Sequence, residues 1–310
     1  MADNNSMVGG GSLQRPISDE VIIVQLLVVI FLCINLLLIV TFFSKDFFYT
    51  TMRYMLFAVT LLSDSLILFM SDILLIFTFL RFNMQTGLCV IIYIVLVVYT
   101  FVTPLTLTAM TLERYVAICM PLRHPELCTT RSALRCILII HGLSSVPCIV
   151  VLSIFFALTP NSFFTQYKIC SMGMFVSFRW QDHVKFAVYQ SYFLIMSVTI
   201  IFSYIEIVKV AKAASGENKK STWKGLRTVI LHAFQLLLCL IQLWCPFIEN
   251  AVLQINLMLY INVRYFNYIT FNLAPRCLSP LIYGLRDEKF FLALKYNAPF
   301  GFHCVKTVPV

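Results

Sequence analysis

Charged residues are scarce in this chain. Asp, Glu, Lys and Arg make up only 12% of its 310 residues, whereas 60% are hydrophobic. A soluble domain carries much more charge on its surface, so this composition excludes that class and indicates an integral membrane protein. The net charge of +9 does not indicate nucleic-acid binding, because the basic residues lie in short segments between apolar runs rather than beside stacking aromatics in one region.

Signatures of several other classes are missing too. The sequence has no convincing nucleophile and base, no glycine-rich phosphate loop and no metal-ligand spacing around His141, so we expect no catalytic residues, no cofactor and no metal. Inverted repeats and paired discontinuous helices, which are typical of transporters, are absent as well. No basic stretch precedes the first apolar run and no small-residue cleavage site follows it, which argues against a cleaved signal peptide.

Long apolar segments are what the chain does contain. There are seven, at residues 20–43, 54–79, 88–118, 136–158, 184–208, 227–254 and 262–285. Each is close to the roughly 20 residues that cross a hydrocarbon core as a helix. They are too long and too uniformly apolar for barrel strands. The sequence therefore predicts an all-α membrane protein, a seven-transmembrane helix bundle over residues 20–286. We expect a disordered extracellular tail at 1–19, and an amphipathic helix with a cytoplasmic tail at 287–310.

Lysine and arginine residues are divided unequally between the two sets of connecting segments. Sixteen lie on the side that holds residues 44–53 and 209–227, and six lie on the side of the N-terminus. The richer side is cytoplasmic by the positive-inside rule, which predicts a multi-pass plasma-membrane protein with an extracellular N-terminus. Asn4-Asn5-Ser6 is a glycosylation acceptor pattern that fits this orientation, although so short a pattern also arises by chance.

Cysteine placement agrees with that topology. Of eleven cysteines, only Cys89 and Cys170 fall on the predicted outer side, where the environment is oxidising. They can form a disulfide that ties the loop 159–183 to the third span; the alternative is two free thiols. The other cysteines are most simply packing residues, and Cys304 is a candidate for palmitoylation.

Three motifs in separate spans resemble those of one receptor family. Glu113-Arg114-Tyr115 ends the third span, Trp244-Cys245-Pro246 lies in the sixth, and Ser279-Pro280-Leu281-Ile282-Tyr283 lies in the seventh. Together with seven spans and the cysteine pair, they resemble the rhodopsin-type, class A G-protein-coupled receptors. The likeness covers nearly the whole chain past residue 20.

Within that family, the chain is similar to vertebrate odorant receptors. The hallmark at the inner end of the third span is largely present, as Met110, Arg114 to Cys119, and Pro121 to Arg123. Glu113 in place of the usual aspartate and the Trp244 motif are departures, which is why the chain resembles a divergent, fish-type branch. The resemblance implies an odorant receptor of sensory neuron cilia that binds a small, mostly apolar odorant. It also implies that the receptor activates a heterotrimeric G protein of the olfactory stimulatory type. Membrane lipids are the other expected partners, and nucleic acid is not expected to bind. The alternative is a non-olfactory class A receptor for another small ligand.

The resemblance also assigns residues for coupling and activation. These are Glu113, Arg114, Tyr115, Leu122, Tyr204 and Tyr283. Arg114 is expected to hold the resting state and then receive the G protein, and Leu122 to dock into it; the alternative for Arg114 is an anchor to lipid phosphate. The acid that family members carry at the base of the sixth helix is missing, and Lys224 and Arg227 lie there. We therefore expect packing and Glu113 to hold the closed state, with appreciable basal signalling.

Two charges fall inside the spans. Asp64 lies in the middle of the second span and Arg276 lies one turn before Pro280, where a lone guanidinium would be very costly. Arginine can hold a carboxylate through two hydrogen bonds, so we expect an ion pair between them. The alternative is that Arg276 faces a water-filled vestibule and Asp64 binds sodium, as the matching acid does in the wider family.

Ligand recognition is expected in the outer half of the bundle. By helical spacing the inward candidates are Leu96, Val97, Thr100, Phe101, Val188, Tyr189, Tyr192, Trp244, Phe247, Ile248, Ala251, Ile269 and Asn272. Each of them is equally explained by helix packing. Asp72 and Glu249 either face a cationic ligand group or pair with Arg81 or Arg264. Pro246 is expected to bend the sixth helix, so that pressure on Trp244 swings its inner end.

Overall fold

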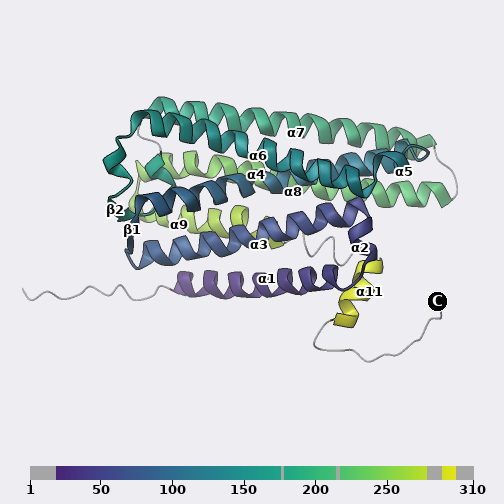
Figure 1. Ribbon diagram of the computed structural model, residues 1–310, viewed down its shortest axis with the longest axis horizontal. Coiled ribbons are helices and arrows are strands. Elements are labelled where there is room, and N and C mark those ends of the chain that lie inside the picture. The colour runs from purple at the N-terminus through teal and green to yellow at the C-terminus, as the bar shows by residue number, and fades with distance from the viewer. Residues whose placement is uncertain (1–18, 176–177, 214–216, 278–287, 298–310) are drawn as a thin grey trace, which may run out of the picture.

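The computed structural model describes residues 19–175, 178–213, 217–277 and 288–297. Within these ranges, long helices lie side by side along one axis (Figure 1). They are α1 (Asp19–Phe43), α3 (Met52–Phe79), α4 (Thr86–Cys119), α6 (Thr130–Leu158), α7 (Arg179–Ala213) and α8 (Glu217–Leu253). The predicted features at Asn4, Ser279 to Tyr283 and Cys304 lie outside the described residues.

Six helices in these ranges are long and apolar enough to cross a membrane. A seventh helical stretch begins with α9 (Leu257–Asn267), passes through the π-helix η3 (Tyr268–Leu273) and is described as far as residue 277. The arrangement confirms the predicted all-α bundle. It also places the π-helix, a feature that is often found at functional sites, so that it ends three residues before Arg276.

Several helices are longer than their apolar segments. Polar residues that favour helix extend α7 and α8 beyond the predicted spans. Helix α6 begins at Thr130 because the Thr129 side chain accepts a hydrogen bond from the Ser132 N–H at 3.2 Å. Helix α9 begins at Leu257 because Asn256 caps it, accepting from the Met258 N–H at 2.8 Å. Hydropathy finds the part of a helix that lies in lipid, whereas the caps determine where the helix starts.

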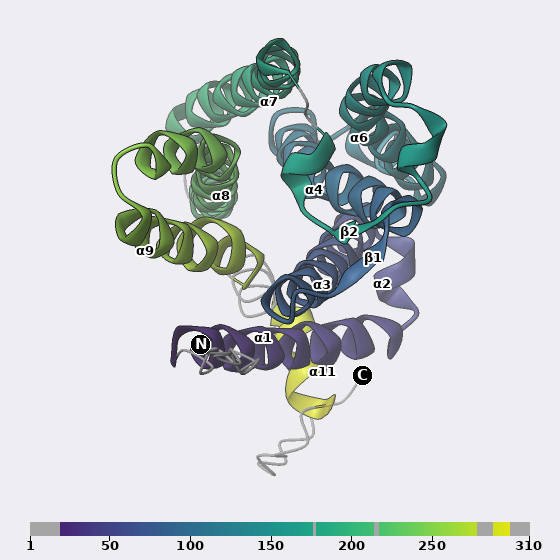
Figure 2. The same ribbon diagram turned by 90° about the vertical axis from the view of Figure 1, so that its left-hand side faces the viewer.

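Helix α4 occupies the centre of the bundle, where it contacts α3, α6, α7 and α8 (Figure 2). In its most apolar stretch 56% of the residues are buried, against 22% for α1 and for α7. Phe101, Val102, Leu107 and Met110 are almost completely buried along it. A residue on α4 can therefore contact several other helices, which is why both candidate sites described below include this helix.

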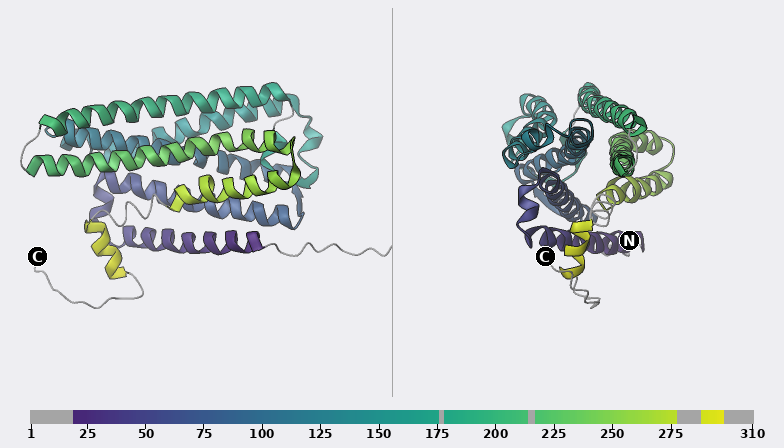
Figure 3. Two further views of the ribbon diagram at one scale, coloured as in Figure 1. Left: turned by 180° about the vertical axis from the view of Figure 1, so that it is seen from behind. Right: turned by 90° about the vertical axis from the view of Figure 1, so that its right-hand side faces the viewer.

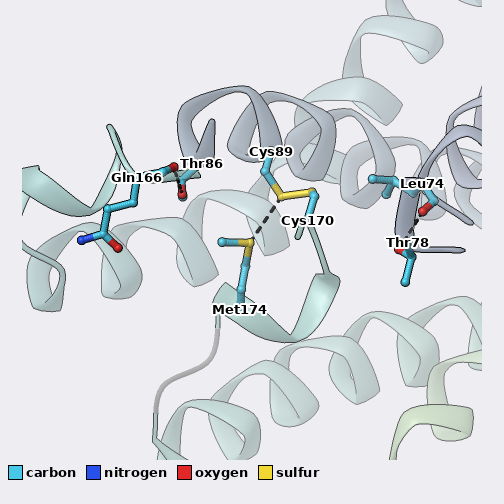
Figure 4. The surroundings of a disulfide bond; sticks show 7 residues. All are labelled: Leu74, Thr78, Thr86, Cys89, Gln166, Cys170 and Met174. Atoms are coloured by element: carbon cyan, nitrogen blue, oxygen red, sulfur yellow. Dashed lines mark hydrogen bonds between the residues drawn. A yellow bond between two sulfur atoms is a disulfide. The ribbon is translucent and has the colours of Figure 1, made fainter. Parts of the chain in front are cut away.

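One end of the bundle, here called the hairpin end, is closed by two short strands. Strands β1 (Asn83–Gln85) and β2 (Tyr167–Ile169) pair antiparallel, with Met84 opposite Lys168. The disulfide between Cys89 and Cys170 joins α4 to the residue after β2, with the two Cα atoms 5.6 Å apart, and Met174 Sδ lies 3.3 Å from Cys89 Sγ (Figure 4). The predicted disulfide is confirmed. It fixes the segment between α6 and α7 over the end of α4.

The opposite end, here called the α5 end, carries the short helices α2 (Phe47–Thr50), α5 (His124–Leu127) and α11 (Glu288–Asn297). Helix α11 runs across the bundle axis beside α1 (Figures 1 and 3). Its Phe290 is buried between Phe48 and Phe57, with ring centroids 5.3 and 5.4 Å away. These aromatic contacts anchor the amphipathic helix that the sequence predicted here.

Candidate functional site

A cluster of polar side chains lies where α4 meets α5, and it is called the rim cluster below. Glu113 is only 7% exposed. Its Oε2 lies 3.6 Å from Arg114 Nε and its Oε1 lies 3.3 Å from His124 Nε2, which donates to it. One carboxylate thus interacts with two basic side chains. The motif at the end of the third span indicated Arg114, but nothing indicated His124, because the turn that brings α5 back against α4 is not visible in a hydropathy pattern.

Cys128 lies next to the rim cluster. Burial, together with the nearby Glu113 carboxylate, raises the pKa of its thiol. Because a raised pKa keeps the thiol protonated at neutral pH, Cys128 is a poor nucleophile and a poor metal ligand. Among the described residues, no group of three or more His, Cys, Asp or Glu side chains is arranged to hold a metal ion.

Helices α4 and α8 are joined near the rim cluster by a hydrogen bond between Thr111 and His232. Thr111 Oγ1 lies 3.2 Å from His232 Nδ1, and both residues are buried. Thr111 already donates its proton to the Leu107 carbonyl at 2.9 Å, so the His232 Nδ1–H must be the donor to Thr111. Sequence reasoning missed this contact, because a lone histidine in an apolar helix gives no signal of its partner.

Apolar packing holds the same part of α8. Leu226 and Val229 are buried against α7, in a cluster that also includes Ile207 and the half-buried Tyr115 and Ile118. The Tyr115 ring lies 5.7 Å from that of Phe202. Leu226 stands in the region where the family's acid is missing. The contacts described there are therefore made by apolar side chains and by His232.

The other predicted coupling residues differ in exposure. Leu122, in the turn between α4 and α5, is 93% exposed, and Tyr204 on α7 is 40% exposed. Tyr283 lies outside the described residues. An almost fully exposed leucine gains nothing from the fold, so its apolar surface is available to another molecule.

A second polar group lies in the middle of the bundle, and it is called the central chain below. Asp64 is completely buried and accepts a hydrogen bond from Thr103 at 2.8 Å, and its Oδ1 lies 4.0 Å from Arg276 Nε. Arg276, also buried, donates through Nη1 to the side-chain oxygen of Asn272. Gln242 Nε2 donates to that same Asn272 oxygen at 3.1 Å. The structure thus brings Asp64 and Arg276 together and links them to α8 through two amides.

A small cavity, called the central cavity below, lies beside Gln242, between α4, α7 and α8. Its volume is about 10 Å³, which is room for roughly one water molecule. Thr100, Phe101, Phe193, Met196, Leu236 and Gln242 are among the residues that line it. Two of them, Thr100 and Phe101, were ligand candidates by helical spacing. Gln242 was missed, since a single glutamine among apolar residues does not by itself indicate which side of a helix faces the bundle.

The remaining ligand candidates on α4 and α7 surround Phe101. Leu96 and Val97 are buried on α4, one turn nearer the hairpin end than Thr100 and Phe101. Tyr189 and Tyr192 of α7 make edge contacts with the Phe101 ring at 4.8 and 5.5 Å. Val188 is half-buried next to them. Of this group Phe101 lines the cavity, and the two tyrosines pack behind its ring.

The candidates on α8 lie elsewhere. Trp244, Phe247, Ile248 and Ala251 are exposed and do not line the cavity. The Trp244 and Phe247 rings instead contact Phe186 of α7, with centroids 5.3 and 4.8 Å apart. Pro246 interrupts the hydrogen bonds of α8 next to them. In the seventh helical stretch, Ile269 is half-buried and Asn272 belongs to the central chain.

The two acids nearer the hairpin end have amide partners. Gln25 donates to Asp72 at 2.6 Å, and Asn267 donates to Glu249 at 3.1 Å. Arg264 donates to the Tyr260 hydroxyl at 3.2 Å. His141 Nδ1 lies 2.8 Å from the Ile137 carbonyl of its own helix, so this side chain has a local structural partner.

Comparison with known proteins agrees with this architecture. A family model described as 7 transmembrane receptor (rhodopsin family) matches residues 34–283. The chain is also 44% identical over 218 residues to Odorant receptor 131-2 of Danio rerio, a stretch that covers 70% of this chain and 67% of that relative. The matched family is one of receptors and not of enzymes. The chain belongs to the rhodopsin family of seven-transmembrane receptors.

Proposed function

We propose that this receptor is an odorant receptor, which binds a small, mostly apolar molecule inside the bundle and activates a heterotrimeric G protein of the olfactory stimulatory type. The observation that carries the proposal is the 44% identity to an odorant receptor over about two thirds of each chain. The lining of the central cavity supports it, because aromatic and aliphatic side chains with few polar groups suit a small apolar ligand.

The orientation follows from charge. The N-terminus is outside the plasma membrane and the α5 end faces the cytoplasm, because the connecting segments at that end carry most of the lysines and arginines. The disulfide then lies on the outer, oxidising side, where such bonds persist. Residues 1–19 form the extracellular tail, 20–286 the receptor domain and 287–310 the cytoplasmic tail, and the receptor resides in sensory cilia.

Coupling takes place at the rim cluster. Glu113 holds Arg114 in the resting state, and release of Arg114 together with an outward movement of the inner end of α8 opens the surface for the G protein. The exposed Leu122 side chain then docks into the partner. Among the described residues, α8 is held there by apolar packing and by the hydrogen bond between Thr111 and His232, and the family's acid is missing from its sequence there, which supports appreciable signalling without ligand.

A cell assay tests this proposal. The full-length receptor is expressed in cultured cells, quantified at the surface, and exposed to a broad odorant panel with a cAMP readout. We expect basal cAMP above that of mock-transfected cells and an increase with selected odorants. The double variant Arg114→Ala with Leu122→Ala should lose the response, whereas Arg131→Ala, which removes an exposed arginine of the same region, should keep it. A full response from the double variant would overturn the coupling role.

A further inference from the structure

The polar groups that line the central cavity have a common property, which is that their strong donors are already used within the protein. Thr100 donates its hydroxyl proton to the Leu96 carbonyl at 2.7 Å. Its oxygen therefore remains only as an acceptor. Cys239 also lines the cavity and brings a thiol, which is only a weak donor.

The orientation of the Gln242 amide follows from the buried arginine. A guanidinium can only donate, so Asn272 must present its oxygen to Arg276. Gln242 must then turn its nitrogen toward that same oxygen, as the 3.1 Å contact from Nε2 has it. The carbonyl end, Oε1, is left without a partner among the described residues. The central chain thus fixes which end of Gln242 a ligand in the cavity meets.

Two prolines add acceptors at the same level. In a helix, the carbonyl of Thr100 would accept from the N–H of residue 104, and that of Gln242 from the N–H of residue 246. Both of these positions are proline, Pro104 in α4 and Pro246 in α8, and neither has an N–H to give. The main-chain carbonyls of Thr100 and Gln242 therefore both lack the N–H that would be their partner in a regular helix.

We propose that the cavity takes the hydroxyl group of a neutral alcohol or phenol, which donates its proton to Gln242 Oε1 or Thr100 Oγ1. The proposal rests on the proposed function as a receptor for small ligands and names the chemical class. The cavity holds about one water, which matches a hydroxyl group and is too small for a carboxylate with its hydration. Ammonium ions are disfavoured, because no carboxylate is among the side chains that line it.

The carbon skeleton of the ligand extends from the cavity toward the hairpin end. Phe101 lines the cavity and is buried, and Tyr189 and Tyr192 pack on its ring, so a carbon skeleton on that side meets apolar side chains and displaces them from one another. A methyl ether or an aldehyde with the same skeleton makes the same apolar contacts, but it cannot donate. Its binding leaves the acceptors of Thr100 and Gln242 buried without a partner, which reduces affinity about tenfold relative to the alcohol.

Matched probes test the proposal by binding rather than by signalling. The purified full-length receptor in lipid nanodiscs is titrated with straight-chain primary alcohols from butanol to decanol, and with the methyl ether and the aldehyde of each. Thermal unfolding reports binding. We expect the best alcohol to bind about tenfold more tightly than its ether and aldehyde. Equal binding of alcohol and ether, or no stabilisation by any probe, overturns the proposal.

Two variants locate the effect. Gln242→Met keeps the length of the side chain but removes the acceptor, and should reduce the preference for the alcohol severalfold. Thr100→Val does the same for the second acceptor and keeps the test decisive if the first variant does not fold. Leu237→Met, at an exposed position of the same helix that does not line the cavity, should keep the full preference. An unchanged preference in both acceptor variants contradicts the proposal. Selective binding without any cAMP response would instead contradict the proposed signalling function.

Discussion

The central chain and the rim cluster are both built from buried polar side chains, but they connect very different parts of the molecule. The central chain joins residues of α3, α4, α8 and the seventh helical stretch, which are far apart in sequence. The rim cluster joins Glu113 to Arg114 and His124, which all lie within a short stretch of chain. A cluster that crosses four helices resists their separation, whereas a local cluster leaves its neighbours free to move.

Burial follows the same division. Asp64 and Arg276 are both almost completely excluded from solvent, whereas at the rim Glu113 is buried but its partners Arg114 and His124 are partly exposed. Breaking the buried pair leaves a bare charge in a medium that cannot solvate it, but water can replace a lost partner at the rim. The comparison indicates that the centre of the bundle maintains the fold, and it supports the proposal that the end of α8 near the rim cluster moves on activation.

The largest effect is expected from removing the central arginine. Arg276→Leu leaves the Asp64 carboxylate buried without its counter-charge, at a cost of about 3 to 5 kcal/mol in folding free energy. Little receptor should then reach the cell surface, as measured by flow cytometry of intact cells. Arg264→Leu, an exposed position in the same helical stretch, is the matched control and should be expressed normally. Equal expression of the two variants would argue against a structural role for the central chain.

A somewhat smaller effect is expected at the hairpin end. Cys170→Ser removes the disulfide to Cys89 and so opens the loop between these two residues, which are 81 positions apart in the sequence. We expect a loss of about 2 to 4 kcal/mol, seen as a lower midpoint of thermal unfolding in detergent. Cys128→Ser removes a free thiol at the other end and should leave the midpoint unchanged. If both variants melted at the same temperature, the disulfide would not be a main stabilising element.

The Thr111 to His232 contact should affect signalling more than stability. His232→Leu removes the hydrogen bond to Thr111 between α4 and α8, and the loss of that bond, worth about 1 kcal/mol, shifts the balance between closed and open states roughly fivefold. Basal cAMP per surface receptor should rise accordingly. Thr111→Val breaks the same bond from the other side and should give a similar rise. A fall in basal cAMP in both variants would indicate that the bond stabilises the open state.

The extent to which sequence predicted the molecule depends on the type of interaction. The helices were predictable because each apolar span must satisfy its own backbone in lipid. The Cys89 and Cys170 pair was predictable because the topology predicted from charge leaves only those two cysteines on the expected outer side. The position of Asp64 near Arg276 also followed from the cost of a lone buried charge.

Contacts between neutral polar side chains were not predictable. Gln242 and His232 each lie on α8, whose rotation about its axis determines what they meet, and hydropathy does not specify that rotation. The expected inward position of Trp244 depended on the same rotation, and its ring instead packs on Phe186. Helix ends such as the Thr129 cap depend on side-chain hydrogen bonds that do not change the apolar pattern.

The smallest effect on the fold is expected at Leu122. Its side chain is 93% exposed, so Leu122→Ala should change the free energy of unfolding by less than about 0.5 kcal/mol. It should nevertheless reduce odorant-stimulated cAMP, because the proposed contact with the G protein loses its apolar surface. Leu226→Ala, the same substitution at a buried position of α8, should destabilise the receptor clearly. Unfolding curves and cAMP responses of the two variants separate docking from packing.

The most direct measurement for the central claim is a double-mutant cycle on the buried pair. Asp64→Asn, Arg276→Gln and the combination of both are compared with the unchanged receptor by surface expression. If the two side chains stabilise each other in the middle of the bundle, each single change removes most of the receptor from the cell surface. The combined change restores most of it, because neither side chain is then charged. A combined variant that loses as much as the two single losses together would contradict the account.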